Sequence, residues 1–224
     1  MVDLARHTLL TVALIGATAV APRLVEGQTA AAAAPVLENR SKGSPRAPVT
    51  VYEMSDFQCP YCRQFALETF PTLEREYIAT GKVHWVFINF PLTSVHPHAA
   101  AAAQVALCAA DQRGFWRVHD LLFRNQDKWA PLKEVGPFFL SLADSAGLSK
   151  STMLACLEAP ETLNAVKADA EGAARSGAGS TPTFYIEGGL LEGALPVAVF
   201  RQVLDSVYKV KSVGRADRRT GGPQ

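Results

Sequence analysis

The pattern of hydrophobic positions first predicts a strand, a helix and a second strand. Residues 49–54 are rich in β-branched and aromatic side chains, which predicts a strand at about 48–54. From Cys62 onward, apolar residues recur at three- and four-residue spacings, which predicts a helix over 60–79 that Pro71 bends or interrupts. Residues 83–90 are a nearly unbroken apolar run, typical of a strand covered on both faces. This order predicts a parallel βαβ unit.

Helical patterns then dominate before the strand pattern returns. Gly, Pro and Ser separate helical segments at about 97–111, 114–126, 132–146, 149–157 and 160–176. A strand at 183–186, a turn at 187–189 and a second strand at 190–191 predict a hairpin, followed by a last helix from Pro196. The fold class is therefore α/β, with a large helical insertion at about 95–177 between the βαβ unit and the hairpin.

The N-terminal residues are expected to be a targeting segment rather than part of the fold. Arg6 and His7 precede an apolar run at 9–21, and small residues follow, which is the order of a secretory signal peptide within 1–30. The apolar run is shorter than the roughly 20 residues that span a bilayer. An uncleaved anchor, which would tether the domain to the membrane, is the alternative.

Composition divides the rest of the chain into three parts. Residues 31–46 are rich in Ala, Gly, Ser and Pro and are predicted to be a linker. Residues 47–210 carry the strand and helix patterns and form the domain. Residues 211–224 are polar and basic, which predicts a disordered tail.

Charge and cysteine content narrow the classes of function. The 224-residue chain has 22 basic and 21 acidic side chains, so its charge does not indicate nucleic acid as a partner. Export would place the chain in an oxidising, periplasmic or otherwise extracytoplasmic compartment, where its four cysteines can pair. We expect Cys59 to pair with Cys62, and Cys108 with Cys156. The second pair would be structural and would stabilise the fold by ~4 kcal/mol.

The candidate chemistry lies in the motif Cys59-Pro60-Tyr61-Cys62, where the first strand gives way to the helix. Pro60 suits the first helical position, so Cys59 falls at the N-cap, where free N–H groups and the helix dipole favour a thiolate. Such a cysteine has a pKa of roughly 3.5–7.5, and we expect it to be exposed. Cys62 lies on the buried stripe of the helix. The motif thus predicts a nucleophilic Cys59 and a resolving Cys62.

Two other groups of residues bear on a metal site, and neither favours one. His96 and His98 flank Pro97, and such a pair usually caps a helix or faces solvent. Zinc would require a second closely spaced cysteine pair, and Cys108 and Cys156 lie far apart. We expect no metal, and no nicotinamide or flavin cofactor, because the electrons can move through sulfur alone.

Four features together resemble the DsbA-type branch of the thioredoxin superfamily over about residues 45–210. They are the export signal, the sequence Asp-Phe-Gln-Cys-Pro-Tyr-Cys at 56–62, the helical insertion and Ser-Thr-Pro-Thr-Phe at 180–184. The resemblance implies a thioredoxin-like fold with a cis bond between Thr181 and Pro182. Such a bond would leave the backbone of Thr181 free to pair with an extended substrate.

The resemblance also implies an acidic residue near the second cysteine, and Glu53 occupies that position. A buried carboxyl there would have a raised pKa and could exchange the proton of Cys62. A carboxylate at the exposed end of the strand is the alternative.

The function that the resemblance implies is that of an extracytoplasmic protein disulfide oxidoreductase. It would donate its disulfide to reduced or partly folded exported proteins and be reoxidised by a membrane quinone-linked oxidase. Some DsbA proteins carry histidine in place of Tyr61, and because tyrosine cannot be cationic, we expect a milder oxidant. Glutaredoxins share the Cys-Pro-Tyr-Cys motif but lack such an insertion. A reductase or isomerase kept reduced by a membrane partner, and a non-catalytic chaperone or binding module, are the alternatives.

Overall fold

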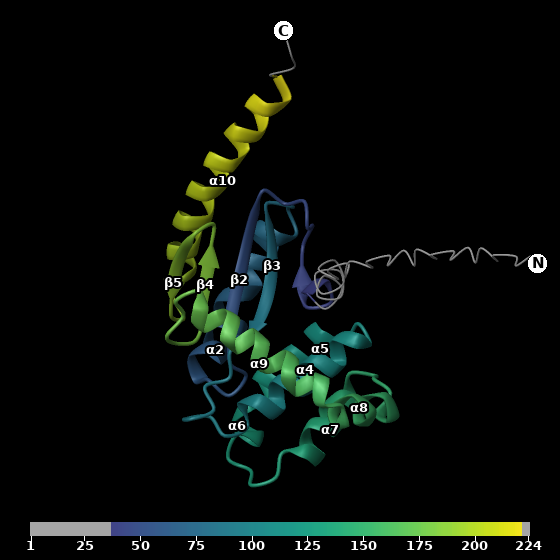
Figure 1. Ribbon diagram of the computed structural model, residues 1–224. Helices are drawn as coiled ribbons and strands as arrows, with labels where there is room; N and C mark the ends of the chain where they lie inside the picture. Colours follow the sequence, from purple (N-terminus) through teal and green to yellow (C-terminus); the bar gives the residue numbers. More distant parts are fainter. Residues whose placement is uncertain (1–36, 221–224) are drawn as a thin grey trace, which may run out of the picture.

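The computed structural model describes residues 37–220, which form a five-stranded sheet with helices packed around it (Figure 1). The strand order is β1-β3-β2-β4-β5. The strands are β1 (Ser41–Lys42), β2 (Val49–Ser55), β3 (Val83–Asn89), β4 (Thr183–Ile186) and β5 (Gly189–Glu192).

Most helices of the insertion gather beyond one end of the sheet, and the last of them packs against one of its faces (Figure 1). Helix α10 (Val197–Thr220) extends beyond the opposite end. The insertion comprises α4 (Ala99–Asp111), α5 (Phe115–Arg124), α6 (Gln126–Trp129), α7 (Gly136–Ser145), α8 (Lys150–Glu158) and α9 (Pro160–Arg175). These helices lie close to the predicted segments, except that the second segment is interrupted at Asn125 and continues as α6. The predicted α/β fold with a helical insertion is therefore confirmed.

The predicted parallel βαβ unit is present. β2 pairs in parallel with β3, with Val49 opposite Val83 and Ser55 opposite Asn89. β4 pairs antiparallel to β2 on its other side. β2 is the third of the five strands and so the central one, and it leads directly into the cysteine motif.

The helix after the motif runs to Ile78 without a break, but its hydrogen-bond pattern changes. It begins as α2 (Pro60–Gln64) and continues as α3 (Phe70–Leu73), with the π-helical segments η1 (Phe65–Thr69) before and η2 (Glu74–Ile78) after α3. Pro71 stands in the first turn of α3, where a missing N–H is tolerated. The predicted interruption thus takes the form of a π-helical segment just before Pro71.

Side chains alternate between the two faces of β2. Val49 and Val51 belong to the core cluster that the helix after the motif covers, and Glu53 and Ser55 lie on the same face. Met54 lies on the opposite face, in a smaller cluster with residues of α9. The cysteine-bearing helix therefore packs over the face of β2 that carries Glu53.

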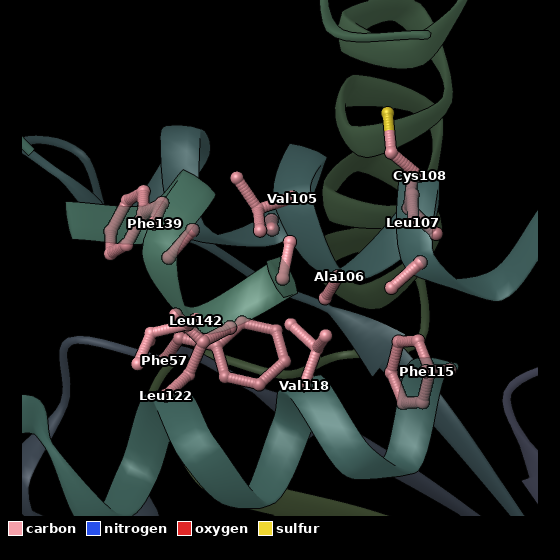
Figure 2. Close-up of a cluster of buried hydrophobic side chains, with 14 of the residues drawn as sticks. Phe57, Val105, Ala106, Leu107, Cys108, Phe115, Val118, Leu122, Phe139 and Leu142 are labelled. Atoms are coloured by element: carbon pink, nitrogen blue, oxygen red, sulfur yellow. The ribbon is translucent and has the colours of Figure 1, made fainter. Parts of the chain in front are cut away.

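The insertion has its own hydrophobic core around α4. Figure 2 shows Phe115, Val118 and Leu122 directed from α5 toward α4, and all three are fully buried. Phe57, two residues before the cysteine motif, belongs to the same cluster and packs against Phe123, with ring centroids 5.0 Å apart. The motif is therefore held by the insertion as well as by the sheet.

The hairpin and the last helix follow the prediction at their starts. The turn between β4 and β5 has positive φ at Glu187 and Gly188, 48° and 96°, which matches the twist of a two-residue hairpin. The last helix, α10 (Val197–Thr220), begins one residue after Pro196. None of the helices within residues 37–220 has both the length and the apolar character needed to span a membrane.

Two predictions about the ends of the domain are wrong. The predicted linker at 31–46 is part of the fold from residue 37, because β1 pairs with β3 and the buried Arg40 forms an ion pair with Asp169 of α9. The predicted disordered tail at 211–224 continues α10 as far as Thr220, since Lys, Arg and Ala favour helix and no proline intervenes. The predicted signal peptide lies outside the described residues.

Candidate active site

Cys59 and Cys62 lie at the start of α2, as predicted, and both are free thiols in this structure. Cys59 is the N-cap residue, with extended backbone angles, and Pro60 follows at the first helical position. Cys62 is fully buried. Cys59 is only 3% exposed, so the expectation of an exposed Cys59 is wrong.

The segment before β4 lies against Cys59. The bond between Thr181 and Pro182 is cis, as the resemblance implied. The Sγ of Cys59 donates a hydrogen bond to the carbonyl oxygen of Thr181 at 3.4 Å. Thr181 is itself buried, and its hydroxyl has no hydrogen-bond partner among the described residues. Residues 122 positions apart in the sequence thus meet at the sulfur of Cys59.

The pKa values of the two thiols shift in opposite directions. The pKa of Cys59 is lowered to about 6, and a hydrogen bond with Cys62 is the largest cause. Burial opposes this shift. Thr181 and the N–H groups of Cys62 and Tyr61 lower the pKa further. The predicted capping hydrogen bond to Sγ is not formed in this thiol state. Burial raises the pKa of Cys62, and Cys59 raises it further, although the N–H of Asp56 lies 3.4 Å from its Sγ. One sulfur is therefore suited to ionise and the other to hold a proton.

Glu53 is buried within β2, so the alternative of an exposed carboxylate is wrong. Its Oε2 accepts a hydrogen bond from Nε1 of Trp85 at 2.9 Å, and its Oε1 has no partner among the described residues. Burial raises the pKa of Glu53 to about 7, against the lowering effect of Trp85 and Ser55. A carboxyl with this pKa is suited to exchange protons at neutral pH.

Gln126 of the insertion hydrogen-bonds to the loop that contains Phe57 and Cys59. The sequence did not indicate this contact. The buried Nε2 of Gln126 donates to the carbonyl oxygens of Phe57 at 2.7 Å and Cys59 at 3.0 Å. A single glutamine in a helical segment carries no local signal of such a contact. It positions the loop from a helix that lies more than sixty residues away.

Asp56 and His96 form a hydrogen-bonded pair beside the dithiol. Oδ2 of Asp56 lies 2.8 Å from Nδ1 of His96 and accepts from the N–H of Leu92 at 2.8 Å, while Oδ1 accepts from the N–H of Gln58. His98 is the N-cap residue of α4, a placement expected for such a pair. Within residues 37–220, no three His, Cys, Asp or Glu side chains are arranged to hold a metal ion.

Cys108 and Cys156 form the predicted disulfide, with Cα atoms 5.7 Å apart. The bond joins α4 to α8. Figure 2 shows the sulfur of Cys108 at the margin of the insertion core, pointing away from Phe115. The bond is separate from the dithiol and belongs to the packing of the insertion.

The fold and the dithiol together define a thioredoxin-like protein with a DsbA-like helical insertion. The model of the thioredoxin family matches residues 37–206, and the chain belongs to this family. The crystal structure of alpha-DsbA1 from Wolbachia pipientis has the same fold, with a TM-score of 0.70 and 23% identity, over 78% of this chain and 93% of that one.

Two relatives with known names are similar to the chain in sequence. It is 25% identical over 191 residues to disulfide bond formation protein D of Bacillus subtilis, which covers 84% of this chain and 82% of the relative. It is 35% identical over 147 residues to Na(+)/H(+) antiporter NhaA 3 of Salinispora tropica, which covers 66% of this chain. The matched region is only 21% of the antiporter's own length.

Proposed function

We propose that this chain is an extracytoplasmic thiol:disulfide oxidoreductase that donates its Cys59–Cys62 disulfide to reduced or partly folded exported proteins. The observation that carries the proposal is the unequal pair of thiols. Cys59, at the helix N-cap beside cis-Pro182, has a pKa of about 6, whereas the pKa of the fully buried Cys62 is raised. This asymmetry suits exchange in which Cys59 meets the substrate and Cys62 stays inside.

The reaction would proceed in two exchanges. A substrate thiolate attacks the Sγ of Cys59, the Cys59–Cys62 bond breaks, and its electron pair moves to Cys62. A second substrate thiolate then attacks the substrate sulfur of the mixed disulfide, and Cys59 leaves as a thiolate. The substrate gains a disulfide and loses two electrons to the enzyme. The lowered pKa of Cys59 favours this last step, because it makes Cys59 a good leaving group.

The neighbouring residues would support these steps. Glu53 would return a proton to Cys62 when that sulfur leaves, since its pKa of about 7 allows it to hold one at neutral pH. The carbonyl of Thr181, which accepts from Cys59 in the dithiol, becomes free when Cys59 joins a substrate. It could then pair with the extended backbone of that substrate.

The proposed compartment and direction rest on separate observations. A disulfide between Cys108 and Cys156 favours an oxidising compartment, and the predicted signal at 1–30 would deliver the chain there. The Bacillus subtilis relative is named as a disulfide bond formation protein, which supports the oxidising direction. Reoxidation would fall to a membrane redox partner, by resemblance a quinone-linked oxidase.

Two measurements test the proposal. Oxidised protein should form disulfides in a reduced, unfolded test protein, and Cys59→Ser should abolish this; retained activity would favour the binding module. Equilibration with glutathione gives the reduction potential. A value at or below that of thioredoxin, about −270 mV, would refute the oxidase and favour the reductase or isomerase.

A further inference from the structure

Ser55 is a second buried polar side chain on the face of β2 that carries Glu53. The two residues are two positions apart, so they share a face, and each is 1% exposed. The cysteine-bearing helix packs over this face. Immediately after Ser55, the N–H of Asp56 lies 3.4 Å from the Sγ of Cys62. Ser55 therefore occupies the stretch of β2 between the carboxyl and the buried thiol.

Glu53 and Ser55 each have an unused hydrogen-bonding position. Glu53 binds Trp85 through Oε2 and leaves Oε1 without a partner, and the Oγ of Ser55 has none within residues 37–220. A buried polar atom without a partner is destabilising, because it has lost its hydrogen bonds to water. Residues opposite Glu53 on the neighbouring strands are Phe87 and Phe184, which offer no polar group. Glu53 and Ser55 can therefore answer each other and the thiol beyond them, and Ser55 also has Asn89 opposite it on β3, whose Nδ2 binds Asp169 and whose Oδ1 has no partner within residues 37–220.

The Oγ of Ser55 forms no hydrogen bond within residues 37–220 in this thiol state, but it lies near enough to both titratable groups to affect their pKa values. Burial raises the pKa of Glu53, and Trp85 and Ser55 oppose that rise. Burial and then Cys59 raise the pKa of Cys62, and Asp56 and Ser55 oppose that rise. Ser55 thus favours the charged form of each group. A hydroxyl can donate to one group while it accepts from the other, which is what a proton relay requires.

Asp56 is the other carboxylate near the dithiol, but its contacts direct it elsewhere. It presents only its backbone N–H to Cys62. Its Oδ2 bonds His96 and the N–H of Leu92, and its Oδ1 bonds the N–H of Gln58. Cys59 on the same helix is then the titratable group that acts directly on Cys62. Glu53 shares a face of β2 with Ser55, whose hydroxyl lowers the pKa of both Glu53 and Cys62.

We propose that Ser55 relays the proton between Glu53 and Cys62. The inference rests on the proposed function. When a substrate thiolate attacks Cys59, the electron pair of the broken disulfide moves to Cys62. Ser55 donates its hydroxyl proton to that sulfur and receives the carboxyl proton of Glu53, so that Cys62 ends as a thiol and Glu53 as a carboxylate. In the reverse step, the proton passes from Cys62 to Glu53 as Cys62 attacks a mixed disulfide.

The test follows oxidation of the dithiol, because the attack by Cys59 and the attack by Cys62 can be measured separately in this direction. Reduced protein is mixed with glutathione disulfide from pH 5 to 9, quenched in acid and alkylated, and the glutathionylated and oxidised forms are counted by mass spectrometry. Formation of the mixed disulfide reports attack by Cys59, and its loss reports attack by Cys62. The variants are Ser55→Ala, Glu53→Gln, their combination, and Thr69→Val. Thr69 is a matched control, because its buried hydroxyl bonds the carbonyl of Leu195 instead.

We expect the second exchange to slow about 100-fold at pH 7 in Ser55→Ala and in Glu53→Gln. The inflection near pH 7 should disappear in both, so that the rate rises steadily with pH. The combined variant should be no slower than the slower single variant, because both residues act in one path. The first exchange in Ser55→Ala, and both exchanges in Thr69→Val, should match the wild type.

Several results would overturn the relay. They are a wild-type rate and pH profile in Ser55→Ala, an equal slowing of both exchanges with the inflection retained, or single-variant losses that multiply in the combined variant. If Ser55→Ala does not fold, the wild type decides in mixtures of H₂O and D₂O. A bowed dependence of the second rate is expected when two protons move, and a straight line refutes the relay. Absence of any exchange in the wild type would instead refute the proposed function.

Discussion

Replacing Glu53 by glutamine is expected to change how the free energy of unfolding depends on pH. Burial raises the pKa of Glu53 from 4.5 to about 7. Each pKa unit corresponds to about 1.4 kcal/mol. Ionising Glu53 in the folded protein therefore costs about 3 kcal/mol more than ionising it in the unfolded chain. Glutamine keeps a side-chain oxygen that can accept from Trp85, so the variant removes the charge and retains that contact.

The direction follows from which state binds the proton more tightly. Below pH 4.5 both states hold the proton of Glu53, and the stability that it confers is fully present. As the pH rises from 4.5 to about 7, the unfolded chain loses the proton first, so the free energy of unfolding falls. Glu53→Gln has no such loss. Its stability relative to the wild type should rise by about 3 kcal/mol between pH 4.5 and pH 8.

Urea unfolding from pH 4.5 to 8.5 measures this difference. Both chains should carry Cys59→Ser and Cys62→Ser, because the lowered pKa of Cys59 gives a pH dependence of the opposite sign. Glu134→Gln, at an exposed position before α7, is the matched control. A flat curve for Glu53→Gln would show that the folded protein does not desolvate this carboxyl. That result would remove the reason to assign it a proton-transfer role.

Three further predictions concern the four cysteines and Tyr61. The rate at which iodoacetamide alkylates Cys59 in the reduced protein should have its midpoint near pH 6. Cys62→Ala should raise this midpoint, because Cys62 is the largest cause of the lowered pKa of Cys59. An unchanged midpoint in the variant would contradict this. Tyr61→His should lower the same midpoint and raise the reduction potential against glutathione, since Tyr61 is 64% exposed and an imidazolium there would lie beside the thiolate. A fall in potential would be the opposite of what the electrostatics require. Replacing Cys108 and Cys156 together by serine should lower the free energy of unfolding by about 4 kcal/mol in urea, without slowing exchange at the dithiol; an unchanged urea midpoint would show that this bond does not stabilise the domain.

The order of the elements and the position of the dithiol could be predicted from the sequence. Both depend on short-range features, namely the hydrophobic period, Pro60 after Cys59 and the turn residues before β5. These features act between residues a few positions apart, so they can be read in the order of the chain. The cis bond before Pro182 and the acidic position at Glu53 came from the family resemblance instead.

Which side chains surround the two sulfurs could not be predicted in this way, because it depends on how distant segments pack together. The hydrogen bonds from Cys59 to Thr181, from Gln126 to Cys59 and from Trp85 to the buried Glu53 all join segments that are distant in the sequence. The ends of the domain show the same limit, since the buried Arg40 pairs with Asp169 of α9, which is distant in the sequence. A local pattern records whether a residue is polar, but burial and pKa depend on what the folded chain brings next to it.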